Sequence, residues 1–274
     1  VFLYLAVLGI IMTVVGNVLL LSVIYLAKTL HTPKYTIVFN LALTDLCGST
    51  ALIPKVLDTF LFDNRYIVYE ACLSYMFFVW FFLSVQSWTL VIMAYDRFIA
   101  ICFPLRYHMW VVLLSITACT VGLLDRLSFC GSLAIQSFIC GRGLILDLAC
   151  GDTSLISNIV FFCFVLNPCL PPIFIILTYV CIAIALSRVA SRKERLKSAK
   201  TCTSHLIVVA IYFIPLLCIS LISDVDRDGT IITGVLPDIL PPLINPILYS
   251  LKTEEVLNSI KKLSEFTKCR KVNQ

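Results

Sequence analysis

The stretch MAYDRFIAIC, residues 93–102, closes a long apolar segment with a charged pair, Asp96 and Arg97. An ionised side chain at the centre of a bilayer costs about 3 kcal/mol or more, so the pair is expected at a water boundary or in a functional role. The stretch FPLRY, residues 103–107, follows at once and adds Arg106. We therefore take this region as the end of a membrane-spanning helix and place the other segments relative to it.

The composition indicates a polytopic membrane protein. Hydrophobic residues make up 60% of the 274 residues and charged residues 14%, whereas soluble domains have roughly 25% charged residues. Long apolar segments recur, each near the roughly 20 residues that a helix needs to cross a bilayer. The sequence predicts an all-α fold, a single domain that forms a seven-transmembrane helix bundle with a short amphipathic eighth helix. The predicted spans are residues 1–27, 35–56, 71–103, 110–130, 155–186, 201–223 and 230–251, and the amphipathic helix is expected at 252–264.

The distribution of positive charge predicts the topology. Sixteen of the 21 Lys and Arg residues fall on one side of the predicted helices, so that side is expected to be cytoplasmic and the N-terminus extracellular. The net charge of +5 is then a topology signal, and nucleic-acid binding is not needed to explain it. The first segment lacks the basic region and cleavage site of a signal peptide and no initiator Met precedes it, so we expect a short N-terminal tail to be missing.

Four of the 13 cysteines, Cys72, Cys130, Cys140 and Cys150, fall on the predicted outer side. That side is oxidising, so these residues can form disulfides, and four half-cystines allow three connectivities. No set of Cys and His residues has zinc-site spacing, and no cofactor is expected.

Polar side chains inside the apolar segments are candidates for a polar hub. Gly16 next to Asn17 predicts close helix packing, with Asn17 bonded to a neighbouring backbone. Asp45 lies in mid-membrane and needs a partner, water or an ion such as sodium. It has two interpretations: a proton relay, as in a transporter, or a structural and switching hub. Gln86 adds polar capacity to the third helix.

Prolines interrupt the fifth, sixth and seventh predicted helices. Asn167-Pro168 and Pro171-Pro172 lie in the fifth, where proline frees backbone carbonyls and implies a bend facing a cavity. Pro215 predicts a kink in the sixth helix beside aromatic residues. Asn245-Pro246 interrupts the backbone hydrogen bonds of the seventh helix, and this interruption suits alternative packings of that helix.

Together, Asp45, the Asp96-Arg97 pair, Pro215 and the stretch NPILY (245–249) resemble the rhodopsin-like G-protein-coupled receptors over the whole chain. Four motifs are similar to those of the odorant receptor family within that class: LHTPKY (30–35), MAYDRFIAIC (93–102), TCTSHL (201–206) and PLINPILYSL (242–251). The sequence departs from the family at three positions. Phe98 stands where the family usually has Tyr, Lys34 where it often has Met, and Thr178 where it commonly has Ser. The residues around Phe98 and the stretch FPLRY are similar to those of fish odorant receptors.

The resemblance implies a function and a disulfide pattern. Cys72 would pair with Cys140, which leaves Cys130 to Cys150. A small-molecule odorant would bind in the outer cavity of a receptor that is not an enzyme. The receptor would then activate a heterotrimeric G protein of the stimulatory, olfactory type and raise cyclic AMP. The protein would lie in the plasma membrane of an olfactory sensory neuron, with its C-terminus in the cytoplasm.

The resemblance also assigns site residues. The predicted ligand-lining residues are Met76, Val79, Trp80, Leu83, Ser84, Cys163, Asn167, Phe213, Leu217, Ser220 and Asp238. The predicted switch and G-protein-coupling residues are Asp96, Arg97, Arg106, Tyr179, Lys193, Lys200, His205, Asn245, Pro246 and Tyr249. The predicted polar hub consists of Asn17, Asp45 and Gln86.

Three rival functions remain open at this point. A non-olfactory rhodopsin-like receptor is the nearest. An ion-coupled secondary transporter would use Asp45 and the broken helices, but the odd number of helices and the lack of an inverted repeat disfavour it. An intramembrane hydrolase is weaker still, because no arrangement of Ser, His and Asp indicates an activated nucleophile.

Overall fold

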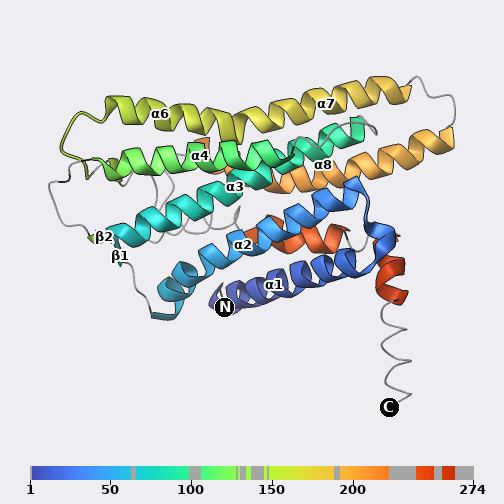
Figure 1. The fold of residues 1–274 in the computed structure, drawn as a ribbon, viewed down its shortest axis with the longest axis horizontal. Helices are drawn as coiled ribbons and strands as arrows, with labels where there is room; N and C mark the ends of the chain where they lie inside the picture. Colours follow the sequence, from blue (N-terminus) through green and yellow to red (C-terminus); the bar gives the residue numbers. More distant parts are fainter. Residues whose placement is uncertain are drawn as a thin grey trace, which may run out of the picture.

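The computed structural model of the chain describes residues 2–62, 66–98, 106–127, 129, 134–136, 145–146, 148–187, 192–221, 239–249 and 255–262. Long helices lie side by side in a bundle (Figure 1). They are α1 (Phe2–Leu26), α2 (Pro33–Phe62), α3 (Tyr69–Phe98), α4 (Arg106–Asp125), α6 (Ser154–Phe164), α7 (Leu170–Ser187) and α8 (Arg192–Leu221). Residues 239–249 and 255–262 are also helical.

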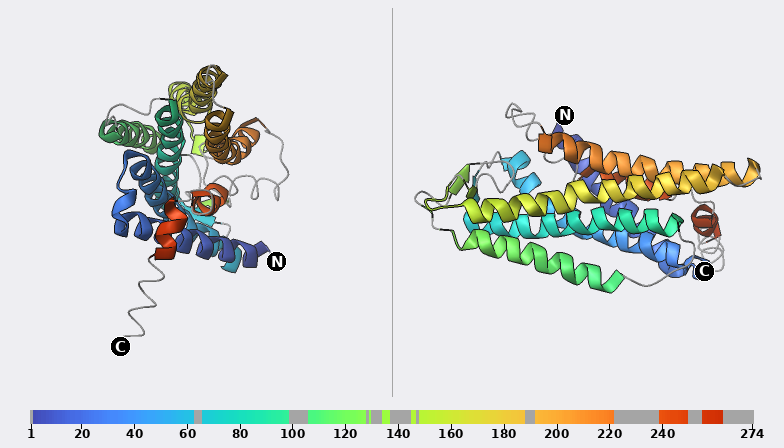
Figure 2. Two further views of the ribbon diagram at one scale, coloured as in Figure 1. Left: turned by 90° about the vertical axis from the view of Figure 1, so that its right-hand side faces the viewer. Right: turned by 90° about the horizontal axis from the view of Figure 1, so that it is seen from above.

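The third helix occupies the middle of the bundle. Seen end-on, α3 lies between α2, α4, α7 and α8, and it contacts all four (Figure 2). Among the described residues, the segments Leu8–Leu26, Tyr69–Asp96 and Leu170–Ser187 are long and apolar enough to cross a membrane. Backbone polar groups in a bilayer have no water to bond, so helices that satisfy these groups internally are the expected structure.

The helix of the fifth predicted span is interrupted. Helices α6 and α7 are joined by η2 (Val165–Cys169), a π-helical segment that contains Asn167 and Pro168 (Figure 1). Proline removes a backbone donor and clashes with the preceding turn, so the backbone widens locally instead of continuing as an α-helix.

Three helices differ most from the predicted spans. Helix α2 continues to Phe62 instead of ending at residue 56, α4 is Arg106–Asp125 instead of 110–130, and α8 begins at Arg192 instead of residue 201. The basic run was predicted as a connection from hydropathy alone, but Arg, Lys, Glu and Ala are strong helix formers outside the membrane as well. Figure 1 shows this end of α8 projecting beyond α3.

A small sheet attaches the loop after α4 to the start of α3. Strands β1 (Tyr66–Val68) and β2 (Ala134–Gln136) pair antiparallel, with Val68 opposite Ala134. Cys72 and Cys150 are each disulfide-bonded. Their predicted partners, Cys140 and Cys130, lie outside the described residues, so the pairing stays a prediction.

The buried side chains form an inner and an outer cluster. The inner cluster includes Leu41, Leu90, Met93 and Tyr212, and the outer one gathers around Cys72 and Met76 near the sheet. Large apolar residues also cover the outside of the bundle, for example Leu19 on α1 and Ile176 on α7, which are 60% and 62% exposed. An apolar exterior of this kind suits a lipid environment.

Candidate functional site

The centre of the candidate site is Asp45 on α2, which is fully buried. Its Oδ1 accepts a hydrogen bond from Gln86 Nε2 at 2.8 Å, and its Oδ2 accepts one from Asn245 Nδ2 at 2.8 Å. Gly48 permits this arrangement, since a Cβ there would lie 3.1 Å from the Cβ of Phe82 on α3. Asp45 therefore joins α2, α3 and the helix 239–249 through two amides.

A metal site at Asp45 receives no direct support. In the part of the chain that the structure describes, no group of three or more His, Cys, Asp and Glu side chains is placed to hold a metal ion. The carboxylate already accepts an amide donor on each oxygen. Sodium binding at Asp45 stays a prediction.

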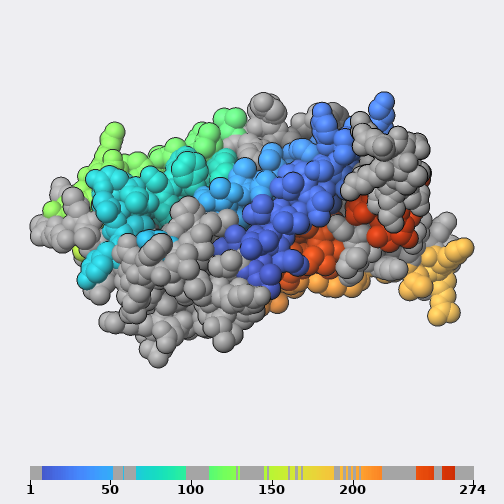
Figure 3. Space-filling view, turned by 90° about the horizontal axis from the view of Figure 1, so that it is seen from below, coloured from blue at the N-terminus to red at the C-terminus, as the bar shows by residue number. Residues whose placement is uncertain are grey.

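The second part of the site joins α1 to the helix 239–249. Asn17 Nδ2 donates to the carbonyl of Pro242 at 2.9 Å, so Asn17 bonds a neighbouring backbone as predicted. Pro246 lies four residues after Pro242 and has no N–H, which leaves that carbonyl without its helical donor. A Cβ on Gly16 would lie 3.2 Å from Pro246 Cβ, so glycine permits the close approach. Figure 3 shows α1 beside the helix 239–249, which is coloured red.

In the third part of the site, between α3 and η2, a side chain again donates to a backbone carbonyl that proline leaves without its helical donor. The hydroxyl of Ser87 donates to the carbonyl of Asn167 at 3.1 Å. An α-helix would supply that carbonyl with the N–H four residues on, and a π-helix with the N–H five residues on. Those residues are Pro171 and Pro172, and neither has an N–H. Ser87 therefore supplies the donor that neither Pro171 nor Pro172 can supply.

The same turn of α3 is also tied to α8. The hydroxyl of Tyr212, which is 2% exposed, donates to the carbonyl of Leu83 at 2.6 Å. The Tyr212 ring packs edge-on against Phe213, with ring centroids 4.8 Å apart. The turn from Leu83 to Ser87 thus holds both η2 and α8.

The site prediction omitted Ser87 and Tyr212. A sequence signal existed for the acceptor of Ser87: the prolines four and five residues after Asn167 imply that the Asn167 carbonyl needs a donor from another helix. No comparable signal pointed to Tyr212, because its acceptor is an ordinary helical carbonyl.

The predicted ligand-lining residues are divided between the two clusters. Met76 is buried in the outer cluster and Trp80 packs against it, whereas Phe213 is buried in the inner cluster and Leu83 and Leu217 pack against that one. Val79 and Ser84 are also buried, and the Ser84 hydroxyl donates to the carbonyl of Trp80 at 2.7 Å. Their contact with a ligand stays a prediction.

The four remaining predicted lining residues are Cys163, Asn167, Ser220 and Asp238. The thiol of Cys163 lies 3.4 Å from Thr120 Oγ1, so this side chain occupies the contact between α6 and α4. The side chain of Ser220 and all of Asp238 lie outside the described residues. Asn167 contributes its backbone carbonyl to the bond with Ser87.

Towards the Asp96 end of the bundle, two contacts join predicted switch residues to other helices. Tyr179 on α7 and His205 on α8 share a hydrogen bond of 2.7 Å between the hydroxyl and Nδ1, and their rings stack at 5.8 Å. The hydroxyl of Tyr249 donates to the Met93 sulfur on α3 at 3.5 Å.

The charged switch candidates are only partly described. Asp96 is half-buried and Lys193 is exposed. The backbone of Arg97 lies in the last turn of α3, but the side chains of Arg97, Arg106 and Lys200 lie outside the described set. Their roles stay predictions.

Replacing Ser87 by Ala is expected to lower the free energy of unfolding by about 1–2 kcal/mol, because the Asn167 carbonyl would lose its buried donor. The measurement is the thermal unfolding midpoint of the purified protein in detergent. Ser115→Ala is the matched control, since that exposed hydroxyl on α4 bonds only within its own helix in the described contacts. Equal midpoints for the two variants would contradict the assigned role.

Comparison with known proteins gives matches over nearly the whole chain. Residues 5–266 match the family described as olfactory receptor. Olfactory receptor 1J1 of Mus musculus is 33% identical over 276 residues, which cover 93% of this chain and 88% of the relative. Olfactory receptor 1L4 of Homo sapiens is 35% identical over 277 residues, covering 92% and 86%. The matched region contains every contact of the site described above.

Proposed function

The chain belongs to the olfactory receptor family of G-protein-coupled receptors, and from this premise we propose that an odorant bound between α3, α6, α8 and helix 239–249 raises cyclic AMP through a stimulatory G protein. Members of this family are multi-pass plasma-membrane proteins without enzymatic activity. Membership sets aside the transporter and hydrolase alternatives. We further propose that the N-terminus is extracellular, the C-terminus cytoplasmic, and the cell an olfactory sensory neuron.

The observation that best supports a ligand-driven switch is the double attachment of one turn of α3. Leu83 and Ser87 bond α8 and η2, and the predicted ligand-lining residues Ser84 and Phe213 lie next to the bonded residues in sequence. A ligand that contacts Ser84 or Phe213 would act on the same turn. It can activate the receptor only by binding one packing of these helices more tightly than another.

The signal must then reach the cytoplasmic ends of the helices. Asp45 and Asn245 connect the middle of α2 and α3 to helix 239–249, and Tyr249 continues that connection to Met93. In the proposed resting packing, the Tyr179–His205 bond holds α8 against α7. On activation α8 would move outward and Arg97 would meet the G-protein α-subunit, with Arg106, Lys193 and Lys200 beside it.

The direct test is a screen of odorants and amino acids on cells that express the full-length receptor, with cyclic AMP as the readout. We expect at least one compound to raise cyclic AMP in a concentration-dependent manner. Cells that lack the stimulatory α-subunit should lose the response. A response that persists in those cells would overturn the assigned G-protein type while leaving the receptor function intact.

The ligand position has its own prediction. Ser84→Val should shift the half-maximal concentration of the activating odorant by about threefold to tenfold, since it removes the buried hydroxyl, and a tenfold shift corresponds to about 1.4 kcal/mol. Phe213→Ala should shift it by a different amount, because that variant removes ring contacts. Ser115→Val, which removes an exposed hydroxyl on α4, is the control. Unchanged concentrations for Ser84→Val and Phe213→Ala would place the ligand elsewhere.

A further inference from the structure

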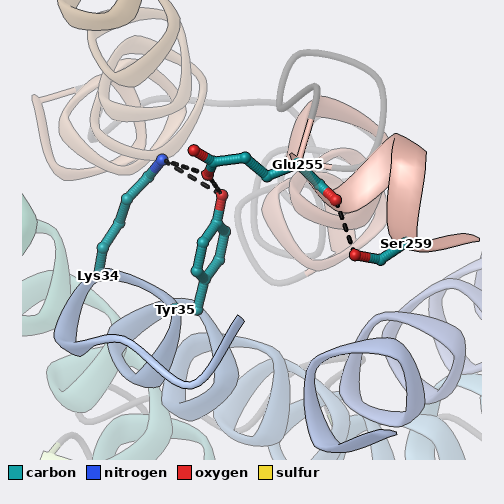
Figure 4. A network of polar contacts seen from close by, with 4 residues as sticks. All are labelled: Lys34, Tyr35, Glu255 and Ser259. Carbon is teal, nitrogen blue, oxygen red and sulfur yellow. Dashed lines mark hydrogen bonds and ion pairs between the residues drawn. The ribbon is translucent and has the colours of Figure 1, made fainter. Parts of the chain in front are cut away.

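Three side chains join the start of α2 to the helix 255–262, and none of them was assigned a role above. The Tyr35 hydroxyl donates to a carboxylate oxygen of Glu255 (Figure 4). The Lys34 ammonium lies 3.5 Å from the same oxygen and donates to the Tyr35 hydroxyl at 3.4 Å. We call Lys34, Tyr35 and Glu255 the Tyr35 clasp.

The members of the Tyr35 clasp differ in exposure and so in strength. The side chains of Lys34 and Glu255 are 41% and 65% exposed, and an ion pair in that setting contributes little to stability. Tyr35 is only 3% exposed, and its hydrogen bond goes to an ionised carboxylate, which makes the bond stronger than a neutral one. Lys34 also lies 4.8 Å above the Tyr35 ring. The clasp therefore depends mainly on Tyr35 and Glu255.

The helix 255–262 has an apolar attachment beneath the clasp. Val256 is fully buried in the inner cluster, which also contains Tyr35, and Ile260 packs against that cluster. Ser259 donates to the backbone carbonyl of Glu255 at 2.8 Å within the same helix (Figure 4). The apolar contacts are not directional, whereas the Tyr35 hydrogen bond defines where the first turn of this helix lies.

A short connection links the clasp to the helix 239–249. Residues 250–254 separate Tyr249 from Glu255, and a connection of that length spans at most about 20 Å even when fully extended. Restraining Glu255 thus limits how far Tyr249 can move. Tyr249 contacts Met93, which precedes the Asp96-Arg97 pair by one turn of α3. The clasp and the G-protein-facing end of α3 are therefore connected through one helix end.

We propose that Tyr35 is a positioning residue that, through Glu255, restrains the cytoplasmic end of helix 239–249 and sets the level of ligand-independent G-protein activation. This inference rests on the proposed switch and adds that the Tyr249–Met93 contact also belongs to its resting packing. Loss of the clasp weakens that packing relative to the signalling one and raises the basal signal. Lys34 has a supporting role.

The test is basal nucleotide exchange on added stimulatory G protein, in membranes that contain equal amounts of full-length receptor and no odorant. Tyr35→Phe and Glu255→Gln are each expected to raise the basal rate at least about threefold, and Lys34→Met should raise it less. The double variant of Tyr35 and Glu255 should not exceed the larger single effect by much, because both remove the same bond. Tyr25→Phe is the matched control, since Tyr25 is 74% exposed on α1.

A second measurement does not depend on signalling. Amide hydrogen exchange over residues 255–262 should become faster in Tyr35→Phe and Glu255→Gln and stay unchanged in Tyr25→Phe. The inference would be overturned if both clasp variants kept the wild-type basal rate of nucleotide exchange and the wild-type rate of amide hydrogen exchange, even if odorant still raises cyclic AMP in the wild type. If neither odorant nor any variant raises nucleotide exchange on the G protein above that of receptor-free membranes, the proposed G-protein coupling fails and the inference fails with it.

Discussion

We expect Arg97→Ala to abolish the odorant-evoked rise in cyclic AMP. Its maximal response should be at least tenfold below that of the wild type, and its surface level should be close to that of the wild type. Arg97 lies in the last turn of α3 beside Asp96, just after the apolar segment Tyr69–Asp96, and an ionised side chain is tolerated more readily at the end of such a segment than within it. A guanidinium offers five donors in a planar fork, which suits alternative pairing with a carboxylate and with carbonyl groups of a partner. The measurement is cyclic AMP at a saturating concentration of the odorant found in the screen, with surface labelling of the same cells.

Arg126→Ala is the control for this prediction. Arg126 is an exposed residue that follows α4 at the opposite end of the bundle, so its replacement removes the same charge at a position far from the proposed switch. The control should signal normally. A full response from Arg97→Ala would rule out the proposed switch.

Asp45→Ala is expected to have the largest effect on stability, about 3 kcal/mol or more. The variant would leave the buried amide donors of Gln86 and Asn245 without their acceptor and would open a cavity between three helices. Most of the protein should then fail to reach the cell surface. The measurements are surface labelling and the thermal unfolding midpoint of the purified fraction.

Asp45→Asn separates the structural role from the charge. Asparagine retains one carbonyl acceptor of similar shape, so we expect this variant to reach the surface at an intermediate level. Glu70→Ala, which removes an exposed carboxylate near the start of α3, should behave as wild type. If Asp45→Ala reached the surface as well as Glu70→Ala, the three-helix junction would not be essential to the fold.

The polar contacts show how far sequence reasoning reaches. The sequence predicted that Asp45 needs a partner and that Asn17 bonds a neighbouring backbone, because unsatisfied polar groups are costly in lipid. The predicted polar hub grouped Gln86 with Asp45, but it did not say which amide bonds which carboxylate oxygen, since Gln86 and Asn245 are distant in sequence and their approach depends on helix rotation. The carbonyls that Asn17 and Ser87 satisfy could have been derived from proline spacing, but the donors could not.

Helix boundaries show the same division. Hydropathy located the apolar segments, and α8 begins at Arg192, before the predicted span, because the bilayer boundary and the helix end are different features. The lining residues on α3 were predicted as members of one ligand site, yet Met76 and Leu83 pack in different clusters. Periodicity gives the face of a helix, but the neighbours of each turn depend on where the adjoining helices cross.

The sequence by itself determined the all-α membrane class, the family and the end of α3 that carries Asp96 and Arg97, because charge, apolar length and motif order are local properties of the chain. The tertiary structure alone decided which donors complete the broken carbonyls, that each Asp45 oxygen accepts a different amide, and that Tyr35 meets Glu255. Each of these contacts connects helices separated along the chain, and their geometry follows from how the helices pack.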